Sequence, residues 1–453
     1  MQRFIPINRE DDLSKPISIQ DCLPEGHLAR YIVEVVESID LSNFEQHYAG
    51  RGSEAYPPSL LLQLFIYAYA TGIFSTRKIE RATYDIIPFR YIACNLHPDH
   101  DTLAKFRKRF KKEFEEVFVQ VLRVAKETGI AQFGKIKVAV DGTKIHANAS
   151  RHSAMSYAHA EKIEAQIKDE VLKLMELAKK AENIPEGMVV PDEIKRREDR
   201  LASIAEAKVK IEARAKERFE QEQAEYAAKV QARRDKEEAT GKKARGKEPT
   251  PPVAGPDPKD QVNLTDEESR IMLQSGGSGF EQCYNAQAAV DVDSLLIVTL
   301  SVTQDANDKK QIEPTLEQLK ELPKDIAQPE QLLADTGYCS EHNVKSCETA
   351  QIEPMIASKR EQHHTPVLER FADDPPALQA DATPMERMKH RLKTREGRKT
   401  YAKRKQTVEP VFGIIKGVMG FRQFLTRGLE NVRNEWNLVC LAWNLKRMAA
   451  LRP

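Results

Sequence analysis

The sequence lacks the marks of secreted, membrane-spanning and zinc-ribbon proteins. Its six cysteines include no C-x-x-C pair, which argues against a zinc ribbon and fits a reducing compartment. The first twelve residues contain no apolar run of the signal-peptide kind, and the most apolar segment, Leu60–Phe74, is too short to span a membrane. We therefore expect a cytoplasmic protein.

Motifs of several common enzyme classes are also missing. The chain has no P-loop, no glycine-rich dinucleotide motif and no G-x-S-x-G elbow. The net charge of the 453 residues is only +1, so overall charge predicts no partner. Charged residues nevertheless make up 31% of the chain, and its cations are clustered, as is typical of proteins that bind nucleic acid. The length predicts about three domains.

Residues 1–132 are predicted to form a helical DNA-binding domain. Helical periodicity occurs at 28–39, 60–74 and 77–83, and a long amphipathic helix is expected at 103–126. Short helices followed by a basic one resemble a helix-turn-helix domain, although they also occur in other roles. The basic run K-F-R-K-R-F-K-K at 105–112 supplies the candidate DNA contacts, which are Lys105, Arg107, Lys108 and Arg109.

The sequence H-P-D-H-D at 97–101 contains residue types that bind metals. A turn at Pro98 and a helix N-cap at Asp101 or Thr102 explain the same residues more simply. We therefore predict a turn and a cap here.

Two short apolar runs each end in an aspartate with a glycine close behind. The first, K-I-K-V-A-V-D-G-T, predicts a buried strand with Asp141 at its carboxyl end, within a core segment at 133–154. The second, at 330–338, predicts a strand that ends before Asp335. Ligands bind at this end of strands in open α/β sheets. A plain strand-ending Asp-Gly turn is the alternative for Asp141.

Residues 155–278 separate these two runs and differ in composition. Two long helices, at 158–182 and 193–239, flank a turn and predict an antiparallel helical hairpin. A basic, proline-rich linker follows. The hairpin fits an arm for DNA or for a partner subunit, and a passive spacer fits equally well.

Core structure is expected to resume at 279–453. A strand hairpin is predicted at 284–302, and a strongly basic segment leads to Glu409. Pro410 disfavours helical geometry in Glu409, so we expect a kink there or a helix that starts near Thr407. A solvated, charged helix is the alternative interpretation of this segment.

Asp141, Asp335 and Glu409 would repel one another at one place unless cations lay between them. Two Mg²⁺ ions, with Mn²⁺ as a possible substitute, would neutralise these oxygen ligands and support in-line phosphoryl displacement. The surrounding Lys and Arg residues would hold a phosphodiester backbone.

At these residues the chain resembles the DDE transposases of bacterial insertion sequences. V-D-G-T contains Asp141, A-D-T-G-Y contains Asp335, and Tyr401, Arg404, Glu409 and Lys416 match the family's Y-R-E-K signature. The resemblance implies an α/β catalytic core of the RNase H-like kind, a mixed sheet flanked by helices, with an all-α N-terminal domain and the hairpin as an insertion.

The resemblance also implies a chemistry. Asp141, Asp335 and Glu409 would bind two Mg²⁺ for cleavage at the transposon end and transfer of the freed 3′-OH to target DNA. Tyr401, Arg404 and Lys416 would contact DNA phosphate, the N-terminal helices would bind terminal inverted repeats, and a homodimer or higher oligomer would pair the ends. A nuclease or resolvase that performs no strand transfer, and a non-catalytic DNA-binding relative, are the alternatives.

Two features depart from the family's pattern. Four residues separate Arg404 from Glu409 where three are usual, so Lys405 would make the contact if the helix were continuous. The large insertion lies between the two aspartates and is helical, whereas several members of the family carry a strand-rich insertion between the second aspartate and the glutamate. The family's properties therefore do not extend to residues 155–278.

Overall fold

The computed structural model describes most of the chain, in two compact units. The described residues are 18–48, 55–179, 188–241, 243, 246–274, 279–359, 373–379 and 381–452. One unit comprises Met1–Asn148, Met272–Ser278 and Cys283–Pro453, and the other comprises Ala149–Ile271 and Gly279–Gln282. Within the described parts, no helix is both long and apolar enough to cross a membrane.

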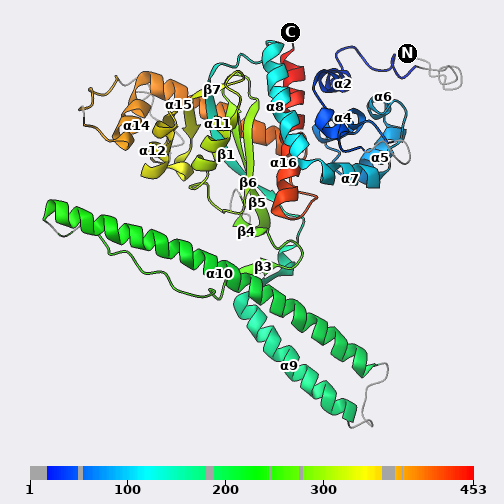
Figure 1. The fold of residues 1–453 in the computed structure, drawn as a ribbon, viewed down its shortest axis with the longest axis vertical. Coiled ribbons are helices and arrows are strands. Elements are labelled where there is room, and N and C mark those ends of the chain that lie inside the picture. Colours follow the sequence, from blue (N-terminus) through cyan, green and yellow to red (C-terminus); the bar gives the residue numbers. More distant parts are fainter. Residues whose placement is uncertain are drawn as a thin grey trace, which may run out of the picture. The chain divides into compact units, whose positions relative to one another are not determined.

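The first unit begins with a group of helices built around one that is buried along most of its length (Figure 1). Residues Leu60–Ala70 are all buried, and helix α4, which contains them, packs against α2, α6 and the C-terminal helix α16. The helices are α2 (Leu28–Ser38), α3 (Ser42–Glu45), α4 (Pro58–Ala70), α5 (Thr76–Asp85), α6 (Ile87–Ile92), α7 (His100–Arg109) and α8 (Lys111–Glu127).

The expected long helix at 103–126 is two helices, so that prediction was wrong. Phe110, with φ −104° and ψ 46°, separates α7 from α8. Its ring is buried against Phe44 and Phe106, and this contact outweighs continuation of the helix. The N-cap of α7 is Asp99, two residues earlier than Asp101, and His100 pairs with Glu80 at 2.7 Å.

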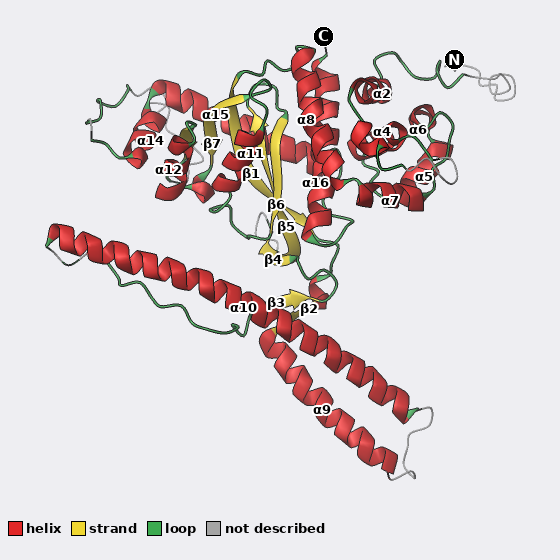
Figure 2. Cartoon of the chain, viewed as in Figure 1, coloured by secondary structure: helices red, strands yellow, loops and turns green. Residues whose placement is uncertain are grey.

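A mixed sheet forms the middle of the first unit and has helices packed against it (Figure 2). The strand order is β4-β5-β1-β7-β8, and β6 also pairs with β5. Pairing is antiparallel between β6, β5 and β1 and parallel between β1, β7 and β8. The strands are β1 (Lys135–His146), β4 (Arg270–Leu273), β5 (Phe280–Asp291), β6 (Ile297–Thr303), β7 (Gln328–Ala334) and β8 (Glu353–Ile356).

The predicted strand hairpin is present as β5 and β6, and the terminal helix is fixed to it. Asn444 accepts from the backbone N–H of Ile297 and donates to its carbonyl, both at 2.8 Å, and the Trp436 indole donates to Gln287. The remaining helices are α11 (Ile312–Glu321), α12 (Glu341–Thr349), α14 (Pro384–Lys393), α15 (Arg395–Gly417) and α16 (Leu429–Leu451), with short 3₁₀ turns at Arg151–Ser153 and Thr336–Tyr338.

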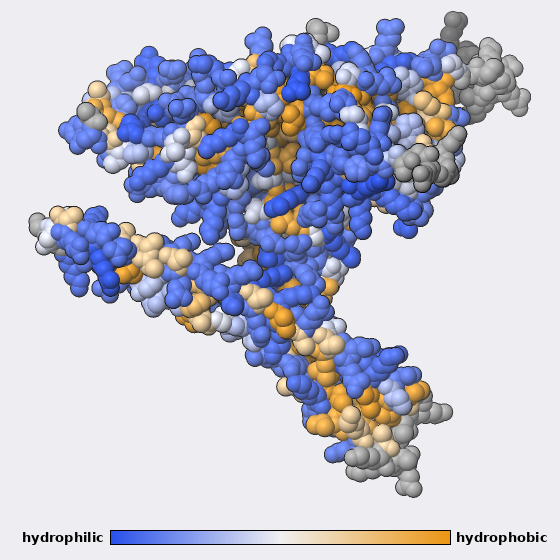
Figure 3. All heavy atoms as spheres, viewed as in Figure 1, coloured by the Kyte–Doolittle hydropathy of each residue, from blue (hydrophilic) through white to orange (hydrophobic). Residues whose placement is uncertain are grey.

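The second unit is an antiparallel helical hairpin on a two-stranded base. Helix α9 (Tyr157–Lys179) lies along α10 (Val190–Thr240), and ion pairs from Glu170 to Arg197 and from Glu164 to Lys208 fix the direction. Strands β2 (Ala154–Ser156) and β3 (Gln261–Asn263) pair antiparallel at the base of the hairpin, next to the start of α9. Figure 3 shows apolar side chains gathered on this hairpin, where Leu172 is exposed.

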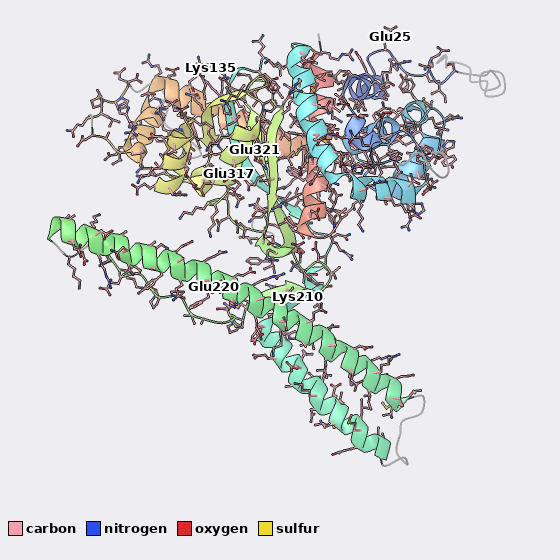
Figure 4. The ribbon with its side chains drawn as sticks, viewed as in Figure 1. Glu25, Lys135, Lys210, Glu220, Glu317 and Glu321 are labelled. Carbon is pink, nitrogen blue, oxygen red and sulfur yellow. The ribbon has the colours of Figure 1, made fainter. Side chains whose placement is uncertain are left out.

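Part of the proline-rich linker is held along α10. Arg218 forms a two-armed ion pair with Asp260 at 2.7 and 2.8 Å, and Arg233 donates to the carbonyl of Lys247. Lys210, labelled in Figure 4, pairs with Glu267. Charged residues of α10 therefore hold the returning chain, in addition to the buried Val262, which packs against Ile204 and Ile211.

Candidate active site

Asp141 lies on β1, and Asp335 directly follows the end of the adjacent parallel strand β7, as predicted. The register pairs Ala139 of β1 with Leu333 of β7, and each aspartate follows two residues later. Asp335 keeps an extended backbone, with φ −82° and ψ −176°. Residues two apart in a strand share a face, and neighbouring strands lie about 4.8 Å apart. The two side chains therefore leave the same face at the same level.

Asp141 does not end its strand, in contrast to the prediction. The antiparallel partner β5 stays paired with β1 from Val138 to His146, so the strand continues past the aspartate. The recorded pairing with β7 stops at Ala139. Asp141 is therefore fixed by backbone pairing on one side and lies where the parallel pairing ends on the other.

Burial and like charge both act on Asp141. Desolvation, followed by the charge of Asp335, raises the pKa of Asp141 to about 7, and Asp308 adds to this. The nearby Arg404 cation and the N–H of Gly142, which donates to Asp141 Oδ1 at 2.8 Å, partly offset the rise. A cluster of carboxylates thus forms at one end of the parallel strands.

Glu409 is joined to this cluster by one guanidinium. Arg404 Nη1 lies 3.5 Å from Asp141 Oδ2, and Arg404 Nη2 lies 3.2 Å from Glu409 Oε1. The Arg404 side chain is 8% exposed and that of Glu409 is 51% exposed. The structure therefore brings the three predicted acids into one neighbourhood, with Arg404 as the cation between the first and the third.

Helix α15 runs from Arg395 to Gly417 through Pro410, so it does not start near Thr407, which was one of the two expectations. Thr394 caps the helix by accepting from Gly397, and Thr407 donates to the Lys403 carbonyl as an interior residue. Proline removes only the bond to the carbonyl four residues earlier, which belongs to exposed Gln406. The buried residues Val408, Val411, Phe412 and Ile415 hold the helix on the core.

The four predicted DNA contacts on α15 differ in exposure. Tyr401 is buried and its hydroxyl donates to the Ala334 carbonyl at 3.2 Å. Lys416 is half-buried, its ammonium donates to the Lys144 carbonyl at 2.9 Å, and burial lowers its pKa. Lys405 is exposed, whereas Arg404 is held by the carboxylates. The continuous helix therefore turns Lys405 outward.

Of the four predicted DNA contacts on α7, the two lysines are exposed and the two arginines are bonded to other protein groups. Lys105 and Lys108 are exposed. Arg107 donates to the hydroxyl of buried Tyr69 at 3.0 Å, and Arg109 donates to the His47 carbonyl and lies over the Tyr48 ring. Both arginines thus make contacts within the N-terminal helices.

Asp308 also belongs to the carboxylate cluster, and sequence reasoning missed it. Its Oδ1 accepts from Asn285 Nδ2 at 2.7 Å and from Gln287 Nε2 at 2.6 Å. A Cβ added at Gly142 would overlap this carboxylate and both amides, so the glycine after Asp141 leaves room for Asp308. The available signal was the pair of polar residues two apart in the apolar strand N-A-Q-A-A-V.

No group of three or more His, Cys, Asp or Glu side chains within the described chain is arranged to hold a metal ion. In this structure Arg404 contacts two of the carboxylates, those of Asp141 and Glu409, and offsets their charge in part. The site therefore offers carboxylate oxygens, which are hard metal ligands, next to the Arg404 guanidinium.

Comparison with known families matches two regions of the chain. Residues 252–445 match the family described as Transposase DDE domain, and residues 17–109 match the family described as Transposase domain (DUF772). No curated protein and no solved structure matches the chain. The DDE match includes Asp335 and Glu409, and the other match includes α2 to α7. With transposase families matched at both ends, the chain belongs to the DDE transposases of insertion sequences.

Proposed function

We propose that the protein binds the terminal inverted repeats of its insertion sequence and catalyses divalent-metal-dependent DNA cleavage and strand transfer. The observation that carries this proposal is that Asp141 on β1 and Asp335 just after β7 each lie two residues beyond the paired residues Ala139 and Leu333, together with the link from Asp141 through Arg404 to Glu409. The strand order β6-β5-β1-β7-β8, antiparallel and then parallel, supports an RNase H-like core.

The donor set fits magnesium. Asp141, Asp335 and Glu409 offer only carboxylate oxygens, which Mg²⁺ and Mn²⁺ prefer, and the raised pKa of Asp141 reflects burial and the charges of Asp335 and Asp308, which Arg404 offsets only in part. When bound there, a pair of such ions supplies activation of the attacking oxygen and stabilisation of the leaving oxygen. Arg404 would then release the carboxylates it holds in this structure.

The chain's own groups would hold the DNA around these acids. Lys405 is exposed one turn before Glu409 and is suited to a phosphate oxygen. Lys416 and Tyr401 are anchored by backbone carbonyls of β1 and β7, so they would place the phosphate close to the strand ends. Arg404 would be a further phosphate contact once it leaves the acids.

We assign domains on the same basis. Residues 1–132 would be the DNA-binding domain, 133–154 and 279–453 the catalytic core, and 155–278 an insertion. Because both ends of an element must be cut, a homodimer or higher oligomer on DNA is part of the proposal.

The test is a joining assay. The protein is incubated in Mg²⁺ with a labelled duplex that carries the element's terminus and with target plasmid, and products are separated by size. We expect cleavage at the terminus followed by a labelled plasmid species. Cleavage with no joined product would favour a nuclease or resolvase, and binding with no cleavage would favour a non-catalytic DNA-binding relative.

A further inference from the structure

Helices α4 and α5 are joined by a short turn that is anchored on the catalytic half of the same unit. The turn, Thr71–Ser75, contains Gly72 with φ +84°, where a Cβ would meet the Met419 carbonyl at 2.9 Å. Phe74 packs edge-on against Phe421 with ring centroids 5.2 Å apart. Two helices around a glycine-containing turn are the arrangement of a helix-turn-helix, in which the second helix enters the major groove.

The outer face of α5 is basic. Arg77, Lys78 and Arg81 are exposed, and Tyr84, one turn further, is 54% exposed and stacked on His97 at 3.7 Å. Within the described parts of the chain, the side chains of Arg77 and Lys78 form no ion pair or hydrogen bond. Arg81 pairs with Asp85 at 3.1 Å, but its side chain is 84% exposed and such surface pairs contribute little.

Of the two acids on α5, Asp85 pairs with Arg81 at the end of the helix, and Glu80 is drawn away from the basic face. Glu80 accepts from both the ring and the backbone N–H of His100 on α7. The opposite side of α5 is buried through Ile79, Ala82 and Thr83. Packing therefore fixes the helix with its cations outward, and no side chain caps its N-terminus, where the helix dipole favours phosphate.

Helix α7, which carries the DNA contacts predicted at 105–109, is less suited to recognising a particular base sequence. Its two arginines, Arg107 and Arg109, are held by Tyr69 and His47. Arginine makes the commonest specific base contact, so a helix whose arginines are engaged elsewhere retains only lysines for phosphate.

We propose that α5 is the recognition helix of this transposase, and that Arg77, Lys78 and Arg81 contact the major groove of double-stranded terminal DNA. This inference rests on the proposed function. Through Gly72 and Phe74 the helix is packed on Met419 and Phe421, just after the helix that carries Glu409. A terminus bound by α5 is thereby placed at a fixed offset from the acids.

The test is fluorescence anisotropy with the full-length protein. Two labelled duplexes of equal length are titrated, one with the element's terminus and one with a scrambled sequence, at several salt concentrations. For the double variant Arg77→Ala/Lys78→Ala we expect the affinity ratio between terminal and scrambled DNA to fall roughly tenfold. The matched control is Lys105→Ala/Lys108→Ala, which removes the same charge from α7 and should weaken both duplexes alike.

Thermal melting of both variants checks that they fold, and Arg81→Ala, a single substitution on the same face of α5, should also lower the affinity ratio. A ratio unchanged in Arg77→Ala/Lys78→Ala, or lost only in the α7 control, would overturn the assignment of α5 and leave the proposed function standing. Wild-type protein with no preference for the terminus would contradict the proposed function and the role of α5 together.

Discussion

Arg404 donates a 3.2 Å hydrogen bond to Glu409, five residues later in the same helix, while its other arm lies 3.5 Å from Asp141. Removal of this cation leaves the half-buried Asp141 carboxylate without a positive charge beside it. We predict that Arg404→Leu lowers the free energy of unfolding in EDTA by about 1–3 kcal/mol, as measured by urea denaturation. Lys399→Leu, an exposed position of the same helix, is the control. Equal effects of the two substitutions would contradict the ion-pair account.

Gly142 faces the amides of Asn285 and Gln287 and the Asp308 carboxylate. A methyl group there must displace buried, hydrogen-bonded groups, so we predict that Gly142→Ala destabilises the protein by about 1–3 kcal/mol. Gly413→Ala in α15 is the matched control, because a Cβ there meets no neighbour within 4 Å. It should be neutral or stabilising by about 0.5–1 kcal/mol. Urea denaturation of both compares them directly, and the reverse order would refute the crowding at Gly142.

The pH dependence of stability should report on Asp141. Its pKa rises from an ordinary 3.8 to about 7, so between these values the folded protein binds a proton that the unfolded chain has released. In EDTA, the free energy of unfolding of the wild type relative to Asp141→Asn should therefore fall as pH rises from 4 to 7, by at most about 1.4 kcal/mol per pH unit. The difference should level off above pH 7. A difference that is flat across this range would show that Asp141 is ionised throughout.

Thiol reactivity tests the core independently of activity. Cys94 is exposed, whereas Cys283, Cys347 and Cys440 are buried, and burial raises the pKa of Cys347 to about 12. Iodoacetamide at pH 8 should therefore modify Cys94 quickly and Cys347 only after denaturation. Peptide mass spectrometry measures both sites in one sample. Similar rates at the two sites would mean that α12 does not pack as described.

Local patterns predicted the elements that carry the acids. A β-branched run indicated the strand that contains Asp141, and the apolar run Leu332–Ala334 indicated the strand before Asp335, because both runs are buried in the sheet. Helical spacing around Glu409 likewise indicated the buried face of α15. These features depend on neighbours in sequence, so the sequence was sufficient for them.

Two features depend on contacts between residues that are distant in sequence: the continuity of α15 and the position of Asp308. The rule for residues before proline predicted a break at Glu409, but Val408, Val411 and Phe412 are buried and keep α15 continuous. Asp308 lies in a loop, and its place beside Asp141 follows from the partners Asn285 and Gln287, about twenty residues earlier. Nothing in the flanking sequence of Asp308 marks that contact.

The most direct test of the central claim is end cleavage by conservative variants of the three acids. Asp141→Asn, Asp335→Asn and Glu409→Gln keep side-chain size and remove one charge each. We predict that each binds the terminal duplex but cleaves it at least a hundredfold more slowly in Mg²⁺, on the order of the 10²–10³ lost with a single transition-state stabiliser, whereas Asp305→Asn, in a nearby loop, cleaves as the wild type does. Cleavage at the wild-type rate by any of the three would show that these carboxylates do not form the active site.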